Sequence, residues 1–161
     1  MNNITVQDLC FSYTEDTPIL KKLNLEIDGR KTAVVGQNGA GKTTFVKLLK
    51  GLLKPVSGKI LINGTDISTT TVAELSKQVG MVFQNPDDQI FKNKIIDEVM
   101  FGPLNIFKDK EKARENAVRA LEIVGLKDKM EESPYDFGLS ERKLISIASV
   151  IAMENEIIIL D

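Results

Sequence analysis

The segment that most constrains this chain is a glycine-rich stretch, Gly36-Gln37-Asn38-Gly39-Ala40-Gly41-Lys42-Thr43. It fits the pattern G-x-x-x-x-G-K-[ST] at every fixed position. An apolar run that ends at Val35 precedes it, and an amphipathic helical pattern over residues 45–49 follows it. This order matters because successive loop amides at a helix N-terminus form an anion-binding concavity. We therefore predict a phosphate-binding loop, and not a glycine turn that precedes a lysine by chance.

The residue types of the loop suit a bound nucleotide. Gly36, Gly39 and Gly41 allow the backbone to pass close to phosphate oxygens without a Cβ clash. Lys42 is expected to reach the β- and γ-phosphates as a point charge. The Thr43 hydroxyl is a candidate ligand for Mg²⁺.

The composition excludes several classes of function. Lys and Arg number 21 and Asp and Glu number 23, so the net charge of −2 disfavours a protein that binds nucleic acid. The 161 residues include no histidine and one cysteine, Cys10. Serine–histidine and cysteine–histidine catalysis are therefore excluded, as is a disulfide within the chain, and a structural zinc site is disfavoured. The longest uncharged apolar stretch, Leu144–Met153, is about half as long as a membrane-spanning helix.

Hydrophobic periodicity and turn residues predict alternating strands and helices. The expected strands are Ile4–Tyr13, Leu20–Ile27, Lys31–Val35, Lys59–Ile62, Val79–Phe83 and Ile157–Leu160, with a turn at Asn63-Gly64. One expected helix directly follows the glycine-rich loop and has Gly51 as its C′ residue. The other expected helices span Thr71–Gln78, Ile95–Phe101, Lys110–Val124 and Ser140–Met153. Gly102-Pro103 is expected to break the chain directly after Ile95–Phe101. The run Ile157–Leu160 lacks alternation, which predicts a strand buried on both faces.

Several spaced segments resemble the ATP-binding subunits of ABC transporters. GQNGAGKTT at Gly36–Thr44 and GKILINGTDI at Gly58–Ile67 are typical of that family. VGMVFQNPDDQIF at Val79–Phe91 and FGPLN at Phe101–Asn105 are similar to a narrower group, the ATPases of energy-coupling factor importers and of cobalt or nickel importers. The resemblance extends from Ile4 to Asp161.

The resemblance implies an α/β fold with the P-loop NTPase core of the ABC ATPase type. It implies an N-terminal antiparallel β element and an inserted helical subdomain, with the chain ending after the Walker B strand. We expect a single ATP-binding domain over residues 1–161. Residues 1–84 form the β element and core, residues 85–139 the mostly helical subdomain, and residues 140–161 the signature helix and Walker B strand.

The resemblance also implies roles for residues outside the loop. Tyr13 falls where the family places an aromatic ring that stacks on adenine. Gln84 falls on the Q-loop glutamine, which contacts Mg²⁺ and the attacking water, and Asp161 falls on the Walker B carboxylate for Mg²⁺. Gln84 and Lys42 are the catalytic candidates. ATP is expected to contact Tyr13 and the loop residues Gly36, Asn38, Gly39, Ala40, Gly41, Lys42, Thr43 and Thr44.

The signature motif departs from the family pattern. The segment Phe137-Gly138-Leu139-Ser140-Glu141 stands where the family has Leu-Ser-Gly-Gly-Gln or Leu-Ser-Leu-Gly-Glu. Gly138 occupies the serine position and lacks the hydroxyl that contacts the partner's γ-phosphate, while Ser140 is a candidate N-cap. Two interpretations stay open: a neutral rearrangement around a preserved helix start, or one weakened site in an asymmetric dimer.

A second departure concerns the end of the chain. The family's catalytic glutamate and switch histidine follow the Walker B strand, and neither is present here. We expect a fragment of a longer polypeptide, or else a shortened gene product, that hydrolyses ATP poorly by itself.

The function that the resemblance implies is ATP hydrolysis that energises an importer of a vitamin, cobalt or nickel. The cofactors are ATP and Mg²⁺. The partners are a second ATPase subunit, with the altered signature favouring a heterodimer, and a transmembrane coupling subunit at the inner face of the cell membrane. A soluble ABC-type ATPase not coupled to transport, and a nucleotide-binding fragment that does not hydrolyse, remain alternatives.

Overall fold

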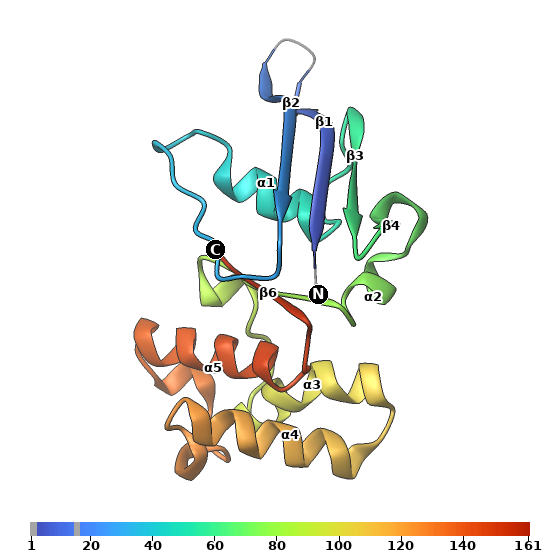
Figure 1. Cartoon of the computed structure of the whole chain (residues 1–161). Coiled ribbons are helices and arrows are strands. Elements are labelled where there is room, and N and C mark those ends of the chain that lie inside the picture. The colour runs from blue at the N-terminus through green and yellow to red at the C-terminus, as the bar shows by residue number, and fades with distance from the viewer. Residues whose placement is uncertain (1–2, 15–16) are drawn as a thin grey trace. The chain divides into compact units, whose positions relative to one another are not determined.

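A computed structural model describes residues 3–14 and 17–161 of the chain (Figure 1). The chain divides into two compact units, Met1–Val79 and Gly80–Asp161. Each unit has its own arrangement of strands and helices and is described by itself.

The first unit contains an antiparallel sheet (Figure 1). Its strands are β1 (Ile4–Ser12), β2 (Pro18–Ile27), β3 (Ser57–Ile62) and β4 (Thr65–Asp66), in the order β2-β1-β3-β4. In the pairing of β1 with β2, Val6 lies opposite Leu25, and in the pairing of β1 with β3, Val6 lies opposite Ile60. Alternate residues of β1 are buried because successive side chains of a strand point to opposite faces. The expected N-terminal antiparallel β element is present.

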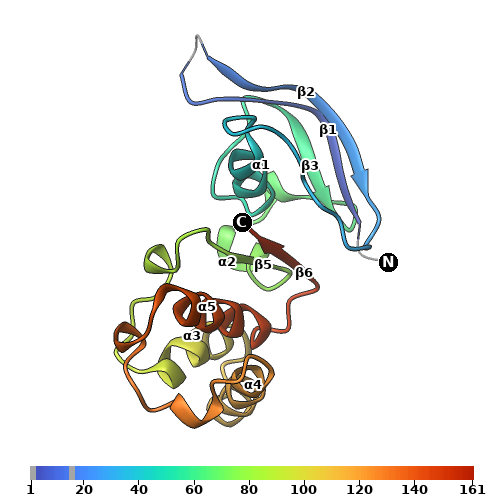
Figure 2. The same cartoon turned by 90° about the vertical axis from the view of Figure 1, so that its left-hand side faces the viewer.

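The first helix of the first unit ends where Gly51 predicts, whereas the second is shorter than the expected Thr71–Gln78 and ends at Leu75. α1 (Lys42–Leu49) buries Phe45 and Leu48, and Figure 2 shows it alongside the sheet. The amides of Gly51 and Leu52 donate to the carbonyls of Leu48 and Lys47 at 3.0 and 2.9 Å, which is the Schellman pattern that closes a helix. α2 (Val72–Leu75) starts with a capping box between Thr71 and Glu74, after a short 3₁₀ turn over Ile67–Thr69.

The expected strand Lys31–Val35 is absent. These residues form no ladder within the described part of the chain, and Val35 is 90% exposed. An apolar run becomes a strand only when a neighbouring strand takes up its backbone hydrogen bonds. The Asn63-Gly64 turn, by contrast, is confirmed: it joins β3 to β4 with φ angles of 50° and 82°.

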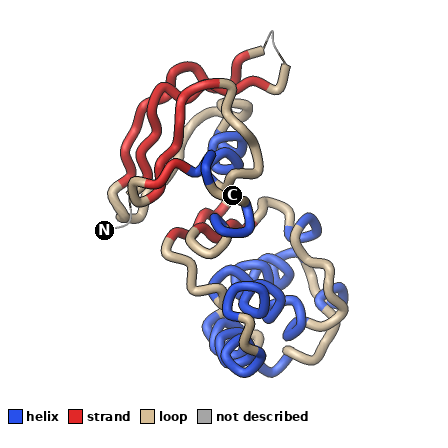
Figure 3. Tube along the Cα trace, turned by 90° about the vertical axis from the view of Figure 1, so that its right-hand side faces the viewer, coloured by secondary structure: helices blue, strands red, loops and turns tan. Residues whose placement is uncertain are grey.

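The helices of the second unit pack against one another, as blue tubes of Figure 3 show. They are α3 (Ile95–Phe107), α4 (Lys110–Ile123) and α5 (Leu139–Ile151). Short 3₁₀ turns cover Pro86–Asp88, Lys127–Lys129 and Pro134–Asp136. The helices share a core of aliphatic side chains that includes Ile95, Val99, Ala113, Ala117, Leu121, Ile145 and Ala148. β5 (Val79–Val82) pairs with β6 (Ile157–Leu160) in a two-stranded sheet.

Two expectations for the second unit are wrong. α3 runs through Gly102-Pro103 and ends at Phe107, followed by Lys108 as a C-cap in the left-handed conformation. Burial of Pro103 beside Val99 and Met100 offsets the backbone hydrogen bond that proline cannot make. β6 is buried on one face only, because alternate residues are largely exposed in this two-stranded sheet, with Leu160 at 66%.

Candidate functional site

The phosphate loop is shaped by two glycines in the left-handed region. Gly39 has a φ of +82° and Gly41 a φ of +86°. The Ala40 amide donates to the Gln37 carbonyl at 3.1 Å, which closes a turn between Gly36 and α1. A Cβ at Gly41 would lie 2.8 Å from Ile19 Cγ2 on β2. Gly41 therefore satisfies both the turn and the close approach of the loop to the sheet.

The start of α1 suits an anion. Gly41 is the N-cap and offers no side-chain oxygen to the first-turn amides, and the first turn contains no acidic residue. The partial positive charge of the helix N-terminus is thus not neutralised within the loop.

Lys42 lies over the loop. Its Nζ donates to the carbonyls of Gly36 and Gln37 at 2.9 and 2.8 Å. A phosphate oxygen is a stronger acceptor for an ammonium group than a neutral carbonyl, since charge-assisted hydrogen bonds are about twice as strong. The geometry therefore suits an ammonium group that exchanges these carbonyls for phosphate.

Tyr13 and Thr44 are brought together by the fold of the first unit. The Tyr13 hydroxyl lies 3.2 Å from Thr44 Oγ1, in the first turn of α1. The Tyr13 ring meets Phe11 edge to face at 4.9 Å between centroids, and the residue is 61% exposed. An exposed ring beside the loop suits stacking on a base, and that role remains a prediction.

Gln84 and Asp161 meet at one end of the β5–β6 sheet in the second unit. The Asp161 amide donates to the Val82 carbonyl at 3.1 Å, which continues the ladder to the last residue. Lys143 Nζ, on α5, donates to the backbone oxygens of Phe83, Gln84 and Asp161 at 2.5, 3.1 and 3.2 Å. No sequence pattern singles out Lys143, which stands in the sequence as one cation before an apolar helix stretch.

The signature segment forms the start of α5. Gly138 is the N-cap, with φ −69° and ψ 167°, and its carbonyl accepts from the Arg142 amide at 3.0 Å. The expectation that Ser140 caps this helix is wrong: Leu139 already begins it, so Ser140 lies inside the first turn.

Glu141 is bound at the same helix start. Its carboxylate accepts from Lys129 Nζ at 2.9 Å. This hydrogen bond, helped by the Gly138 amide, lowers the pKa of Glu141 below its usual value. The start of α5 is thereby fixed to the turn that holds Lys129.

The residues predicted from the sequence as Mg²⁺ ligands carry oxygen atoms that can bind this ion. Thr43 offers a hydroxyl, Gln84 an amide oxygen and Asp161 a carboxylate, and Mg²⁺ prefers such oxygen ligands. Thr43 belongs to the first unit, and Gln84 and Asp161 to the second. Residues 3–14 and 17–161 contain no cluster of three or more His, Cys, Asp or Glu side chains suited to a metal ion. Within the same residues, no helix is long and apolar enough to cross a membrane.

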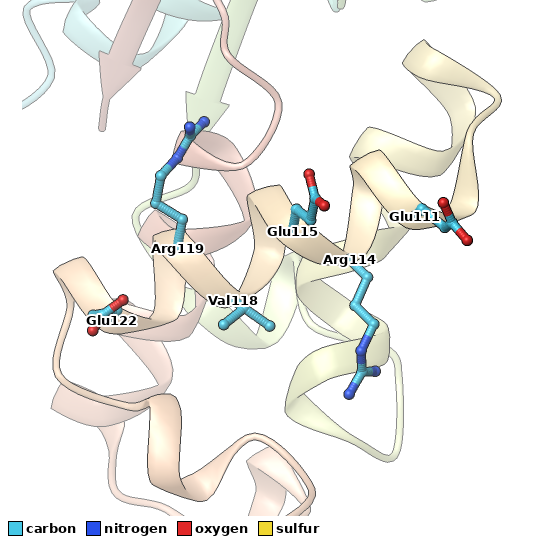
Figure 4. Close-up of a pocket in the computed structure, with 6 residues that line it drawn as sticks. All are labelled: Glu111, Arg114, Glu115, Val118, Arg119 and Glu122. Carbon is cyan, nitrogen blue, oxygen red and sulfur yellow. The ribbon is translucent and has the colours of Figure 1, made fainter.

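A shallow depression on α4 does not resemble a ligand site (Figure 4). All its lining residues belong to one helix: Glu111, Arg114, Glu115, Val118, Arg119 and Glu122. Figure 4 shows their side chains spread along the helix, without convergence on one point. Ligand pockets instead gather a few convergent polar groups in an apolar cleft.

Comparison with known proteins identifies relatives over the whole chain. A sequence model of the ABC transporter family matches residues 20–161. The chain is 42% identical over 163 residues to the energy-coupling factor transporter ATP-binding protein EcfA1 of Methanospirillum hungatei, covering 100% of this chain and 58% of that protein. It is 38% identical over 161 residues to EcfA of Methanothermobacter thermautotrophicus, covering 98% and 52%.

A solved structure shares the fold. The protein cbiO1 from Clostridium perfringens, described as part of the ABC transporter complex cbiONQ, matches with a TM-score of 0.85 and 32% identity. The match covers 98% of this chain and 64% of that one. The expected α/β fold of the ABC ATPase type is confirmed. The chain spans little more than half the length of the two curated relatives.

Proposed function

This chain belongs to the ABC transporter family, and we propose that it binds ATP with Mg²⁺ and supports ATP hydrolysis that energises an importer of the energy-coupling factor type. Two observations support the assignment to this group of importers. Two relatives are named as energy-coupling factor transporter ATP-binding proteins, and the chain is similar to cbiO1. A vitamin, cobalt or nickel is the proposed cargo.

The phosphate loop carries this proposal. Left-handed Gly39 and Gly41, an uncapped α1 N-terminus and Lys42 over the loop together form an anion-binding geometry. Lys42 is the proposed contact for the β- and γ-phosphates, and Tyr13 the proposed stacking partner for adenine. Asn38, Ala40 and Thr44 complete the nucleotide contacts.

Hydrolysis needs a positioned water and neutralised phosphate charge. Gln84 is the proposed residue that orients the water, since its amide both donates and accepts hydrogen bonds. Thr43, Gln84 and Asp161 are the proposed holders of Mg²⁺. When bound, Mg²⁺ supplies charge neutralisation on the phosphate oxygens.

An exposed aromatic patch supports a protein partner. The rings of Phe91 and Phe101 meet edge to face at 4.8 Å, and Lys92 Nζ lies 4.9 and 5.0 Å from their centroids. Phe91 is 52% exposed and Phe101 43%. Buried Glu98 accepts from the amides of Phe91 and Lys92 at 2.9 and 2.8 Å, which fixes this loop. Because aromatic residues are enriched at protein interfaces, we assign this patch to contact with the transmembrane coupling subunit, at the inner face of the membrane.

A second ATPase subunit completes the proposed assembly. Each ATP would lie between the phosphate loop of one subunit and the signature segment of the other, here Gly138 to Glu141. Gly138 cannot offer the hydroxyl that the family's serine offers, which favours a partner of different sequence.

The testing experiment is a calorimetric titration of the purified protein with Mg-ATP, with Lys42→Ala in parallel. Binding by the wild type that is lost in Lys42→Ala supports the nucleotide site, while equal binding by both, or none by either, contradicts it.

Turnover is measured separately on the full gene product, because the lost hydroxyl at Gly138 also favours a second candidate, a subunit that binds but does not hydrolyse. Co-purification with an integral membrane protein tests the coupling to transport.

A further inference from the structure

We propose that Lys143 is a positioning residue that fixes the segment carrying Gln84 to both the end of β6 and the signature helix α5. This inference rests on the proposed ATPase function. Lys143 does not contact substrate in this role, because its ammonium group acts through backbone oxygens.

The contacts of the ammonium group carry the argument. An ammonium group has three donors, and Lys143 Nζ has three backbone acceptors: Phe83 at 2.5 Å, Gln84 at 3.1 Å and Asp161 at 3.2 Å. These oxygens come from the ends of two neighbouring strands. One end carries Gln84, proposed to orient the water and to bind Mg²⁺, and the other carries Asp161, also proposed to bind Mg²⁺. One cation on α5 therefore fixes both ends at once.

Two further contacts bind the same segment to α5. Arg142 Nη1 pairs with Asp87 Oδ1 at 2.6 Å. Gln89 accepts from the Phe83 amide at 3.1 Å and donates to the Ser146 carbonyl at 3.2 Å. Residues 83–89 are thus held along the first two turns of α5, and Lys143 lies at the point where that segment leaves the sheet.

The arrangement connects two proposed sites of one subunit. α5 begins with Gly138, proposed to face the ATP of the partner subunit, and Lys143 lies just over one turn later. A shift of this helix moves the backbone of Gln84 through Lys143. Because a misplacement of about 1 Å at a reacting centre costs about 10²-fold in rate, the position of Gln84 is sensitive to these bonds.

The test is Lys143→Met in the full gene product, with Lys127→Met as the matched control. Lys127 is exposed in the same unit and pairs with Glu122 across the surface. We expect kcat for ATP to fall about 10- to 100-fold in Lys143→Met, with KM within about twofold, because the lost interaction acts on transition-state geometry. Amide hydrogen exchange is expected to rise in peptides covering residues 83–90 and to stay unchanged in α3 and α4.

An unchanged kcat, or exchange that rises equally throughout the second unit, overturns the proposal, since Lys143 would then be neutral or generally structural. If Lys143→Met does not fold, Lys143→Gln, which keeps two N–H donors, is judged by the same kcat and exchange criteria. The outcome is separable from the proposed function, because local exchange at residues 83–90 is read without ATP. Loss of ATP binding in Lys42→Ala reports on the phosphate loop alone.

Discussion

Gly41 meets two independent constraints, and they can be separated by experiment. Its φ of +86° costs an alanine roughly 1–2 kcal/mol, and a Cβ there would also collide with Ile19. Gly39 has nearly the same φ but no atom within 4 Å of a built Cβ. We predict that Gly39→Ala lowers the free energy of unfolding by about 1–2 kcal/mol and that Gly41→Ala lowers it further. Urea unfolding followed by circular dichroism measures both, and equal losses would show that Ile19 moves aside freely.

Lys50 is a buried cation, and its titration is expected to change the free energy of unfolding with pH. Its Nζ donates to Ser76 Oγ at 2.9 Å and to the Val79 carbonyl, and burial lowers its pKa from 10.5 to about 8. Between about pH 8 and 10.5 the unfolded chain therefore holds a proton that the folded chain has lost. The cost of the buried charge is fully present below about pH 8 and is relieved as the pH rises.

We predict that the free energy of unfolding, compared with that of Lys50→Met, rises between about pH 8 and 10.5. Urea titrations of both proteins at several pH values give the difference directly. The difference cancels the titration of groups common to both. A constant difference across that window would mean that Lys50 titrates alike in the folded and unfolded chain.

Functional residues that belong to one local motif can be predicted from the sequence, whereas residues that act through distant contacts cannot. The phosphate loop can be predicted because its function depends on residues adjacent in sequence. Lys143 is not readable, because two of its acceptors lie 60 and 59 positions earlier. The contact of Tyr13 with Thr44, 31 positions apart, likewise follows from no local pattern.

At the scale of elements, a buried amide joins α4 to the end of α5. Asn116 is 6% exposed, and its Nδ2 donates to the Ala152 carbonyl at 3.1 Å. We predict that Asn116→Ala destabilises the protein by about 1–3 kcal/mol, because the carbonyl loses a buried partner. Glu115→Ala, on the exposed part of the same helix, is the control and is expected to stay within about 0.5 kcal/mol. Chemical denaturation compares the two, and similar values would contradict a role for the amide.

The elements that the sequence predicted correctly are those with their own boundary signals. α4 begins at the N-cap Asp109 and is followed by Gly125, and its apolar face is plain in the pattern. The segment Lys31–Val35 has an apolar strand pattern yet lacks a ladder, while α3 passes through Pro103. In both cases tertiary contacts, or their absence, override local preference, which no single segment can reveal.

At the scale of the whole molecule, the altered signature bears on the proposed assembly, in which it would face the nucleotide of the proposed partner subunit. Gly138 has a φ of −69° and no atom within 4 Å of a built Cβ. A serine therefore fits at this N-cap without strain and without displacing a neighbour. The interpretation as a weakened site and the interpretation as a neutral rearrangement then make different predictions for one substitution.

We predict that Gly138→Ser raises ATP turnover of the assembled transporter about two- to twelvefold, the equivalent of a net hydrogen bond of about 0.5–1.5 kcal/mol. Thermal stability should change little, because replacing a glycine N-cap by serine alters the free energy by only a few tenths of a kcal/mol. Steady-state turnover is measured on the complex, with Ser140→Ala as the control for a hydroxyl inside the first turn. Unchanged turnover in Gly138→Ser would favour the neutral rearrangement, because a serine hydroxyl at the helix start would then make no productive contact with the partner's phosphate.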